Sequence, residues 1–149
     1  MALSTVYTLA VFNQAHKKMN VLYHNYAKSA GMSDAAFWLL YSLYEHGRPC
    51  TQKDLCGSWF YAPQTINTAL KSLEKKGLIS LAFVPGNKKN KQIHFTPDGE
   101  KLIQEKIVPM VHAEERSFER LDEDEREKLL LITQKHIALL EEEMNQTTK

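Results

Sequence analysis

Cysteine is scarce in this 149-residue chain, where Cys50 and Cys56 are the only two. Two cysteines cannot supply the disulfide framework on which small secreted domains depend. No apolar run approaches the roughly 18 residues that are needed to cross a bilayer. The first residues also lack the basic start and short apolar core of a signal peptide. We therefore expect a cytoplasmic protein that does not span a membrane.

Motifs that would indicate catalysis are also missing from the sequence. It contains no nucleophile elbow, phosphate-binding loop, dinucleotide fingerprint or spaced set of zinc ligands. The six histidines are scattered, and the segment from His112 to Glu115 does not match the His-Glu-x-x-His pattern. Paired acids such as Glu141 and Glu142 lie in charged stretches that are typical of solvated helix faces. We predict no enzymatic activity, no metal and no cofactor.

Net charge is only +1, but it is divided unevenly along the chain. Residues 51–97 carry seven lysines against two acidic side chains, a balance of +5. Residues 98–149 carry a balance of −6, and residues 1–50 a balance of +2. A basic middle beside an acidic tail suggests a localised surface for a polyanion.

Apolar residues in the first half recur at helical spacing. The pattern predicts a long helix from Ser4 to about Lys28, and a second helix that Ser33 caps and that the turn at residues 46–49 ends. Thr51 and Asp54 open a short helix that ends by about residue 59. The next helix starts at Pro63, buries a stripe at Ile66, Ala69, Leu70 and Leu73, and ends at Gly77.

Beyond Gly77 the period changes to that of strands. Residues 78–84 and 92–95 predict a β-hairpin, and Thr96 caps a fifth helix that Pro109 should kink or interrupt. Asp122 with Glu125 forms a capping-box-like start for a last helix. The predicted fold is mainly α with a small β-hairpin wing, in the order α-α-α-α-β-β-α-α. This is a winged helix-turn-helix core with helical extensions.

The short helix, the longer helix and the hairpin together predict a duplex-DNA interface. A helix of about ten residues can lie in the major groove while the helix before it crosses the backbone. Glutamine and asparagine can pair with adenine, threonine can contact thymine or phosphate, and lysines on the wing suit phosphates or the minor groove. The predicted DNA-contacting residues are Thr51, Gln52, Pro63, Gln64, Thr65, Asn67, Thr68, Lys71, Lys88, Lys89 and Lys91.

Any one of these polar residues is more simply explained as a solvated surface side chain. Their ordered arrangement, in which a capped short helix precedes a lysine-bearing helix and a lysine-tipped hairpin, favours DNA binding. The alternative is a winged helix that serves as a protein-interaction or adaptor module without DNA affinity.

Three motifs in the stretch 33–102 resemble the winged-helix core of the MarR family of bacterial regulators. Residues 51–55 are similar to the opening of the family's first helix-turn-helix helix, and residues 64–79 to its recognition helix and exit. Residues 95–102 are similar to the hydrophobic-Thr-x-x-Gly motif after the wing. With the long first helix and the C-terminal helices, the resemblance covers nearly the whole chain.

The resemblance implies a homodimer that represses transcription from a pseudo-palindromic operator. Residues 1–30 and 97–149 would form the helical dimerisation region, and residues 31–96 the DNA-binding region. A two-fold dimer presents two recognition helices about one DNA turn apart. The family also implies a small aromatic or lipophilic effector that relieves DNA binding. The candidate effector-binding residues are His16, Met19, Tyr23, Phe37, Trp38 and Tyr41, although aromatics at helical spacing equally suit a core.

The sequence departs from the family pattern at several points. The family wing usually carries Asp-x-Arg, where this chain has Asn87-Lys88-Lys89. Lysine lacks the planar fork of arginine, so we expect this wing to add affinity more than specificity. Some relatives sense oxidants through a cysteine in the first helix, and this chain has none there. Cys50 precedes a helix start, a position that can lower a thiol pKa, but a plain structural role is favoured.

Overall fold

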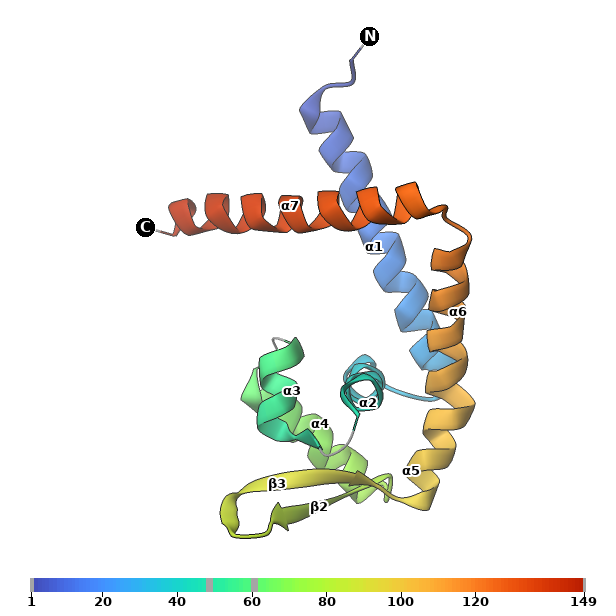
Figure 1. Ribbon diagram of the computed structural model, residues 1–149, viewed down its shortest axis with the longest axis vertical. Helices are drawn as coiled ribbons and strands as arrows, with labels where there is room; N and C mark the ends of the chain where they lie inside the picture. The colour runs from blue at the N-terminus through green and yellow to red at the C-terminus, as the bar shows by residue number, and fades with distance from the viewer. Residues whose placement is uncertain (1, 48–49, 60–61, 149) are drawn as a thin grey trace. The chain divides into compact units, whose positions relative to one another are not determined.

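The computed structural model describes residues 2–47, 50–59 and 62–148 (Figure 1). Arg48 and Pro49, in the predicted turn after the second helix, lie outside this range. The predicted mainly helical fold with a small β wing is confirmed. In chain order the elements are α1 (Thr5–Ser29), α2 (Asp34–His46), β1 (Cys50–Thr51), α3 (Gln52–Trp59), α4 (Pro63–Lys75), β2 (Ile79–Val84), β3 (Asn87–Phe95), α5 (Pro97–Leu102), the π-helix η1 (Ile103–Ile107), α6 (Val108–Glu119) and α7 (Glu123–Thr147).

The helices begin where their capping residues predict. The Ser33 hydroxyl accepts a hydrogen bond from the Ala36 backbone N–H at 3.2 Å, which satisfies a free donor at the start of α2. At the start of α7, Asp122 and Glu125 form both hydrogen bonds of a capping box. Gly77 follows α4 with a φ of 72°, the left-handed conformation that glycine adopts at helix ends.

The sheet has three antiparallel strands in the order β1-β3-β2. The hairpin of β2 and β3 pairs Ile79 with Phe95 at its base, and β1 pairs Cys50 with Ile93 on the other side of β3. The sequence did not predict β1. Two residues are too short to show an alternating pattern, and this strand exists only because β3 offers it an edge.

The chain forms two compact units, Met1–Val108 and Pro109–Lys149. The core of the first unit lies where α2, α3, α4 and the base of the sheet meet. Its largest fully buried side chains come from every one of these elements and from the π-helix: Phe37, Leu40, Leu55, Ile66, Leu70, Leu73, Ile79, Ile103 and Ile107. This core fixes α3, α4 and the wing relative to one another.

The fifth helix widens into η1 before Pro109, where the sequence predicted a kink or an interruption. Proline cannot donate a backbone hydrogen bond to the carbonyl of Glu105, and its ring crowds that carbonyl. A π-turn relieves the conflict while the helical path continues into α6. The Tyr26 hydroxyl of α1 donates to the Lys106 carbonyl at 2.6 Å, which satisfies one acceptor in this segment.

The second unit contains most of α6 and all of α7. Every residue of α7 stays at least partly exposed, although the helix carries many large apolar side chains. Within the described part of the chain, no helix combines the length and the apolar character that crossing a bilayer requires.

Candidate nucleic-acid interface

A reciprocal cap starts α3, the first helix of the helix-turn-helix. The Asp54 backbone N–H donates to the Thr51 hydroxyl oxygen at 3.2 Å. In return, Asp54 Oδ2 accepts from the Thr51 backbone N–H at 2.8 Å and from its hydroxyl at 2.7 Å. The hydrogen bond from the Thr51 hydroxyl, and to a smaller extent the one from the Thr51 backbone N–H, hold the pKa of Asp54 below its usual value. The predicted capping role of Thr51 is confirmed, and its hydroxyl is fixed at the start of the motif.

The recognition helix α4 starts without a side-chain cap, because Ala62 has none to offer and Pro63 occupies its first turn. The Gln52 side-chain amide of α3 donates to the Pro63 carbonyl at 3.2 Å. This bond ties the start of α3 to the start of α4. Gln52 therefore helps to hold the two helices together, a role that the sequence did not predict.

The predicted stripe of α4 is buried, so its opposite side faces out. Ile66, Ala69, Leu70 and Leu73 are all buried, as predicted. Of the α4 residues that are predicted to contact DNA, Asn67 is half-buried and the others are exposed. The Thr68 hydroxyl donates to the Gln64 carbonyl at 3.0 Å, so its oxygen stays available as an acceptor.

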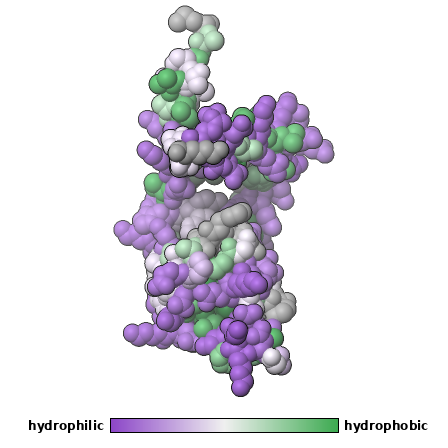
Figure 2. All heavy atoms as spheres, turned by 90° about the vertical axis from the view of Figure 1, so that its left-hand side faces the viewer, coloured by the Kyte–Doolittle hydropathy of each residue, from purple (hydrophilic) through white to green (hydrophobic). Residues whose placement is uncertain are grey.

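A groove of about 550 Å³ lies between α3, α4 and the wing strand β3. It contains seven of the eleven predicted DNA-contacting residues: Thr51, Gln52, Pro63, Asn67, Lys71, Lys89 and Lys91. Lys53 also lines it, and Glu74 is its one acidic lining residue. We call this the lysine groove. Figure 2, which has the wing at the bottom, shows a mostly hydrophilic surface over this end of the first unit.

The remaining predicted readers do not line the lysine groove. Gln64, Thr65 and Thr68 border a shallower depression of about 440 Å³ on the side of α4 that faces α2. Lys88 is exposed near the tip of the wing and does not line this groove. The sequence could not separate these sets, because the separation depends on how α4 and the wing pack.

The wing has Asn87-Lys88-Lys89 in place of the Asp-x-Arg pattern, and local contacts hold this part of the hairpin. The Asn87 side-chain oxygen accepts from the Lys89 backbone N–H at 2.9 Å, which fixes the hairpin turn after Gly86. Opposite Phe83 in the register, Lys91 places its ammonium 5.1 Å from the centre of the Phe83 ring. This cation–π contact holds Lys91 along the wing.

The Thr-x-x-Gly motif after the wing joins α5 to the exit of the recognition helix. Thr96 caps α5 by accepting from the Gly99 backbone N–H at 3.1 Å, and its own hydroxyl donates to the Gly77 carbonyl. The Thr96 backbone N–H donates to the Leu78 carbonyl at 3.1 Å. A Cβ atom on Gly99 would lie 1.9 Å from the Leu78 carbonyl oxygen. The motif therefore needs glycine for a close backbone approach.

The six candidate effector residues fall into two groups. Four aromatic side chains of α1 and α2 pack together, with ring centres 4.9 Å apart for Tyr23 and Trp38 and 5.6 Å for Trp38 and Tyr41. Phe37 is fully buried among them. In contrast, His16 and Met19 are exposed on α1. The structure thus brings four of the six together.

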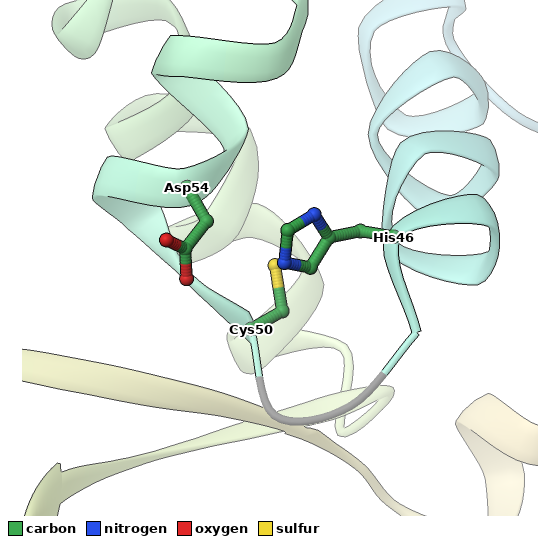
Figure 3. Close-up of side chains that lie close together, drawn as sticks. All are labelled: His46, Cys50 and Asp54. Carbon is green, nitrogen blue, oxygen red and sulfur yellow. The ribbon is translucent and has the colours of Figure 1, made fainter.

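The pKa of the Cys50 thiol is not lowered by its position before α3. Burial first, and the nearby Asp54 carboxylate second, raise the pKa of its thiol to about 11. The helix start does not lower this pKa, because the buried strand position outweighs it, and this agrees with the structural role that the sequence favours for Cys50. Cys50 also lies beside His46 and Asp54, and Figure 3 shows how these side chains come from three different elements. This group was not predicted from the sequence.

Comparisons with known proteins agree with this geometry. Residues 30–89 match a family model described as the MarR family. The DNA complex of S. aureus MepR aligns with a TM-score of 0.72 and 21% identity, over 93% of this chain and 99% of that one. A MarR/EmrR family transcriptional regulator from Acinetobacter sp. ADP1 aligns with a TM-score of 0.68 and 18% identity, over 95% and 99%.

A third solved structure is BpsR of Bordetella bronchiseptica, whose DNA binding is described as regulated by 6-hydroxynicotinic acid. It aligns with a TM-score of 0.67 and 20% identity, over 87% of this chain and 97% of that one. Among curated proteins, none matches the chain. The likenesses to solved structures establish the fold, and the family match covers most of the residues that line the lysine groove.

Proposed function

We propose that this chain, whose winged-helix segment at residues 30–89 belongs to the MarR family, regulates transcription by binding duplex DNA and has no catalytic role. The observation that carries the proposal is the lysine groove beside the exposed start of α4. Such a regulator acts on chromosomal DNA, so we place it in the cytoplasm.

The shape and charge of this surface suit a duplex. The recognition helix α4 has 13 residues, about 20 Å at 1.5 Å per residue, enough to lie in a major groove about 12 Å wide. Four lysines and a single acidic side chain line the adjoining groove. Lysines attract the phosphate backbone without reading sequence, while α4 supplies side chains that can contact base edges. MepR, which shares the fold, has been solved as a complex with DNA.

Asn67 is the residue for which we expect the clearest effect on sequence preference. It projects from α4 into the lysine groove, and an asparagine amide can form two hydrogen bonds with adenine. Replacing Asn67 with alanine should cost about 1–3 kcal/mol on the preferred site and little on unrelated DNA. Fluorescence anisotropy with both duplexes measures the difference.

Ser72 offers a matched control for the Asn67 variant. It lies exposed on the same helix, outside the lysine groove. Replacing Ser72 with alanine should leave the preference for the selected site unchanged. An Asn67→Ala protein that lost affinity equally on both duplexes would show that Asn67 does not read a base.

The proposed regulator is a homodimer, in which residues 1–30 and 97–149 of two copies associate. Large apolar side chains remain exposed along α1 and α7, including Leu22 at 62% and Ile132 at 65%. In Figure 2, the first turns of α1 show hydrophobic surface at the top of the view. Exposed apolar surface on this scale marks an interface, and a two-fold dimer presents two α4 helices to a pseudo-palindromic site.

Two lysines on α7 should separate the dimer. Ile132 and Leu139 are seven residues apart, so they share one face of the helix, and both are exposed in the single chain. Ile132→Lys with Leu139→Lys should raise the dimer dissociation constant at least about 100-fold, because unpaired charges would be buried. Sedimentation at several concentrations measures this change. Gln134→Lys, on another face of the same helix, should remain dimeric; a double variant that stayed dimeric would exclude α7 from the interface.

We further propose that an aromatic effector relieves repression by binding near the cluster of Tyr23, Phe37, Trp38 and Tyr41. These rings pack against one another on α1 and α2, and an aromatic effector would have to insert beside them. BpsR, with the same fold, is regulated by an aromatic acid. Titrating aromatic acids and lipophilic compounds into the protein–DNA complex tests the idea, and a broad panel that never changed DNA affinity would remove it.

A salt series separates this function from an adaptor role. A DNA-binding winged helix loses affinity steeply and linearly on a logarithmic salt scale, because it releases counterions from the phosphates that it neutralises. A protein-interaction module would show no such binding to duplex DNA at low salt.

A further inference from the structure

Three potential metal-binding side chains meet beside the helix-turn-helix. His46 is the last residue of α2, Cys50 lies on β1, and Asp54 lies on the first turn of α3 (Figure 3). One ligand atom from each, a ring nitrogen, the thiol sulfur and a carboxylate oxygen, lies within 4.8 Å of the other two. None of them belongs to the lysine groove.

This donor set suits zinc better than magnesium or calcium. A thiolate and an imidazole are borderline-soft ligands that zinc accepts, whereas the alkaline-earth ions require oxygen. Tetrahedral zinc with bonds of about 2.0–2.3 Å places its ligand atoms about 3.3–3.8 Å apart. A contraction of at most about 1.5 Å would therefore close the group around an ion. His46 is exposed, so its side chain has room to make that movement.

The surroundings already hold two of the three ligands in place. Thr51 donates both of its hydrogen bonds to the same oxygen of Asp54, Oδ2, which orients the carboxylate. Cys50 is fixed by the pairing of β1 with β3 opposite Ile93. Partners of this kind, which orient ligands without touching the metal, commonly raise metal affinity.

Electrostatics at this position also favour a cation. A carboxylate at Asp54 and a thiolate at Cys50 would place two negative charges side by side. A divalent ion would neutralise both groups at once. Binding would displace the thiol proton of Cys50 to solvent, so that zinc takes its place on the sulfur.

We propose that His46, Cys50 and Asp54 bind one Zn²⁺ ion, with a water molecule as the fourth ligand. The ion would join the end of α2 to the start of α3. It would also connect both to β1, the strand that pairs with the wing. The site requires neither DNA nor a dimer, so it stands independently of the proposed regulatory function.

Cobalt substitution in the reduced, metal-free full-length protein provides the first test. Tetrahedral Co²⁺ with one thiolate ligand gives a charge-transfer band in the near ultraviolet and visible d–d bands. One Co²⁺ per chain should produce both, and added Zn²⁺ should remove them. Cys50→Ser should abolish the charge-transfer band, and Cys56→Ser, in the neighbouring helix, should retain it.

His46→Ala provides the decisive variant, because an exposed side chain can be removed without disturbing the core. Changes to residues that only orient zinc ligands cost about 10–100-fold in affinity, so loss of a ligand should cost at least about 100-fold. Competition with a chromophoric chelator measures this loss. Zinc should raise the melting temperature of the wild type more than that of His46→Ala, whereas His112→Ala should match the wild type.

Several results would overturn the zinc site. These are the absence of a cobalt–thiolate band, its loss in Cys56→Ser rather than in Cys50→Ser, or wild-type zinc affinity in His46→Ala. Because no DNA is present, failure here would leave the DNA-binding proposal untouched.

Discussion

Replacing Lys71, Lys89 and Lys91 together with alanine is expected to weaken duplex DNA binding by up to about 500-fold at about 0.1 M salt. These three lysines line the lysine groove from two elements, α4 and β3. Each phosphate neutralised contributes about 0.9 to the slope of log affinity against log salt, so three contacts contribute about 2.7. Between about 0.1 M and about 1 M salt, a slope of about 2.7 changes the affinity by about 500-fold, which is the largest loss expected for the variant.

The control must separate the position of the charges from their number. Lys17, Lys18 and Lys28 are exposed on α1, outside the winged-helix elements, and their replacement removes the same charge. That triple variant should bind DNA with nearly the wild-type affinity and slope. If both triple variants lost affinity equally, attraction would depend on overall charge and the lysine groove would have no special role.

Gly99→Ala is expected to destabilise the protein by about 3 kcal/mol or more. Its new Cβ would lie 1.9 Å from the carbonyl oxygen of Leu78 and 2.9 Å from the carbonyl carbon. Both are backbone atoms between Gly77 and β2, so no side-chain rotation can relieve the overlap. The start of α5 must then move away from this turn, and the hydrogen bonds of Thr96 to Gly77 and Leu78 are disturbed.

Gly57 provides the matched control for this prediction. It lies within α3, and a Cβ there would meet no atom within 4 Å. Gly57→Ala should therefore stabilise the helix by about 0.5–1 kcal/mol, because alanine loses less backbone entropy. Urea unfolding of both variants gives the comparison. A Gly99→Ala protein within about 1 kcal/mol of the wild type would show that this backbone approach is not constraining.

Local chemistry accounts for the parts of the fold that the sequence predicted. Ser33, Thr51 and Asp122 cap helices through hydrogen bonds that span only three residues. The buried stripe of α4 likewise follows from helical spacing and needs no knowledge of the partner elements. Such features depend on near neighbours in the chain, so a single sequence contains the information that specifies them.

Features that depend on distant parts of the chain escaped prediction. The strand β1 exists because β3, some 40 residues later, accepts Cys50 opposite Ile93. The same pairing buries Cys50, so its thiol pKa rises where its position before α3 suggested a fall. The spacing of His46, Cys50 and Asp54 by four residues is visible in the sequence, but their proximity depends on how α2, β1 and α3 pack.

For the surface that we propose contacts DNA, the sequence predicted the composition of the residues more than their arrangement. The sequence identified the outward residues of α4, and all of them are at least partly exposed. It treated the wing lysines as one group, although Lys89 and Lys91 line the lysine groove and Lys88 does not. It also missed that Gln52 bonds to the Pro63 carbonyl, since that contact depends on the packing of α3 against α4.

In-vitro selection from random duplex DNA with the purified protein tests the central claim most directly. A homodimer that reads sequence through two α4 helices should enrich a pseudo-palindrome with half-sites about one helical turn apart. Affinity for the enriched site should fall steeply with salt. If repeated rounds enriched no sequence, and the protein bound no duplex even at low salt, the chain would not be a DNA-binding regulator.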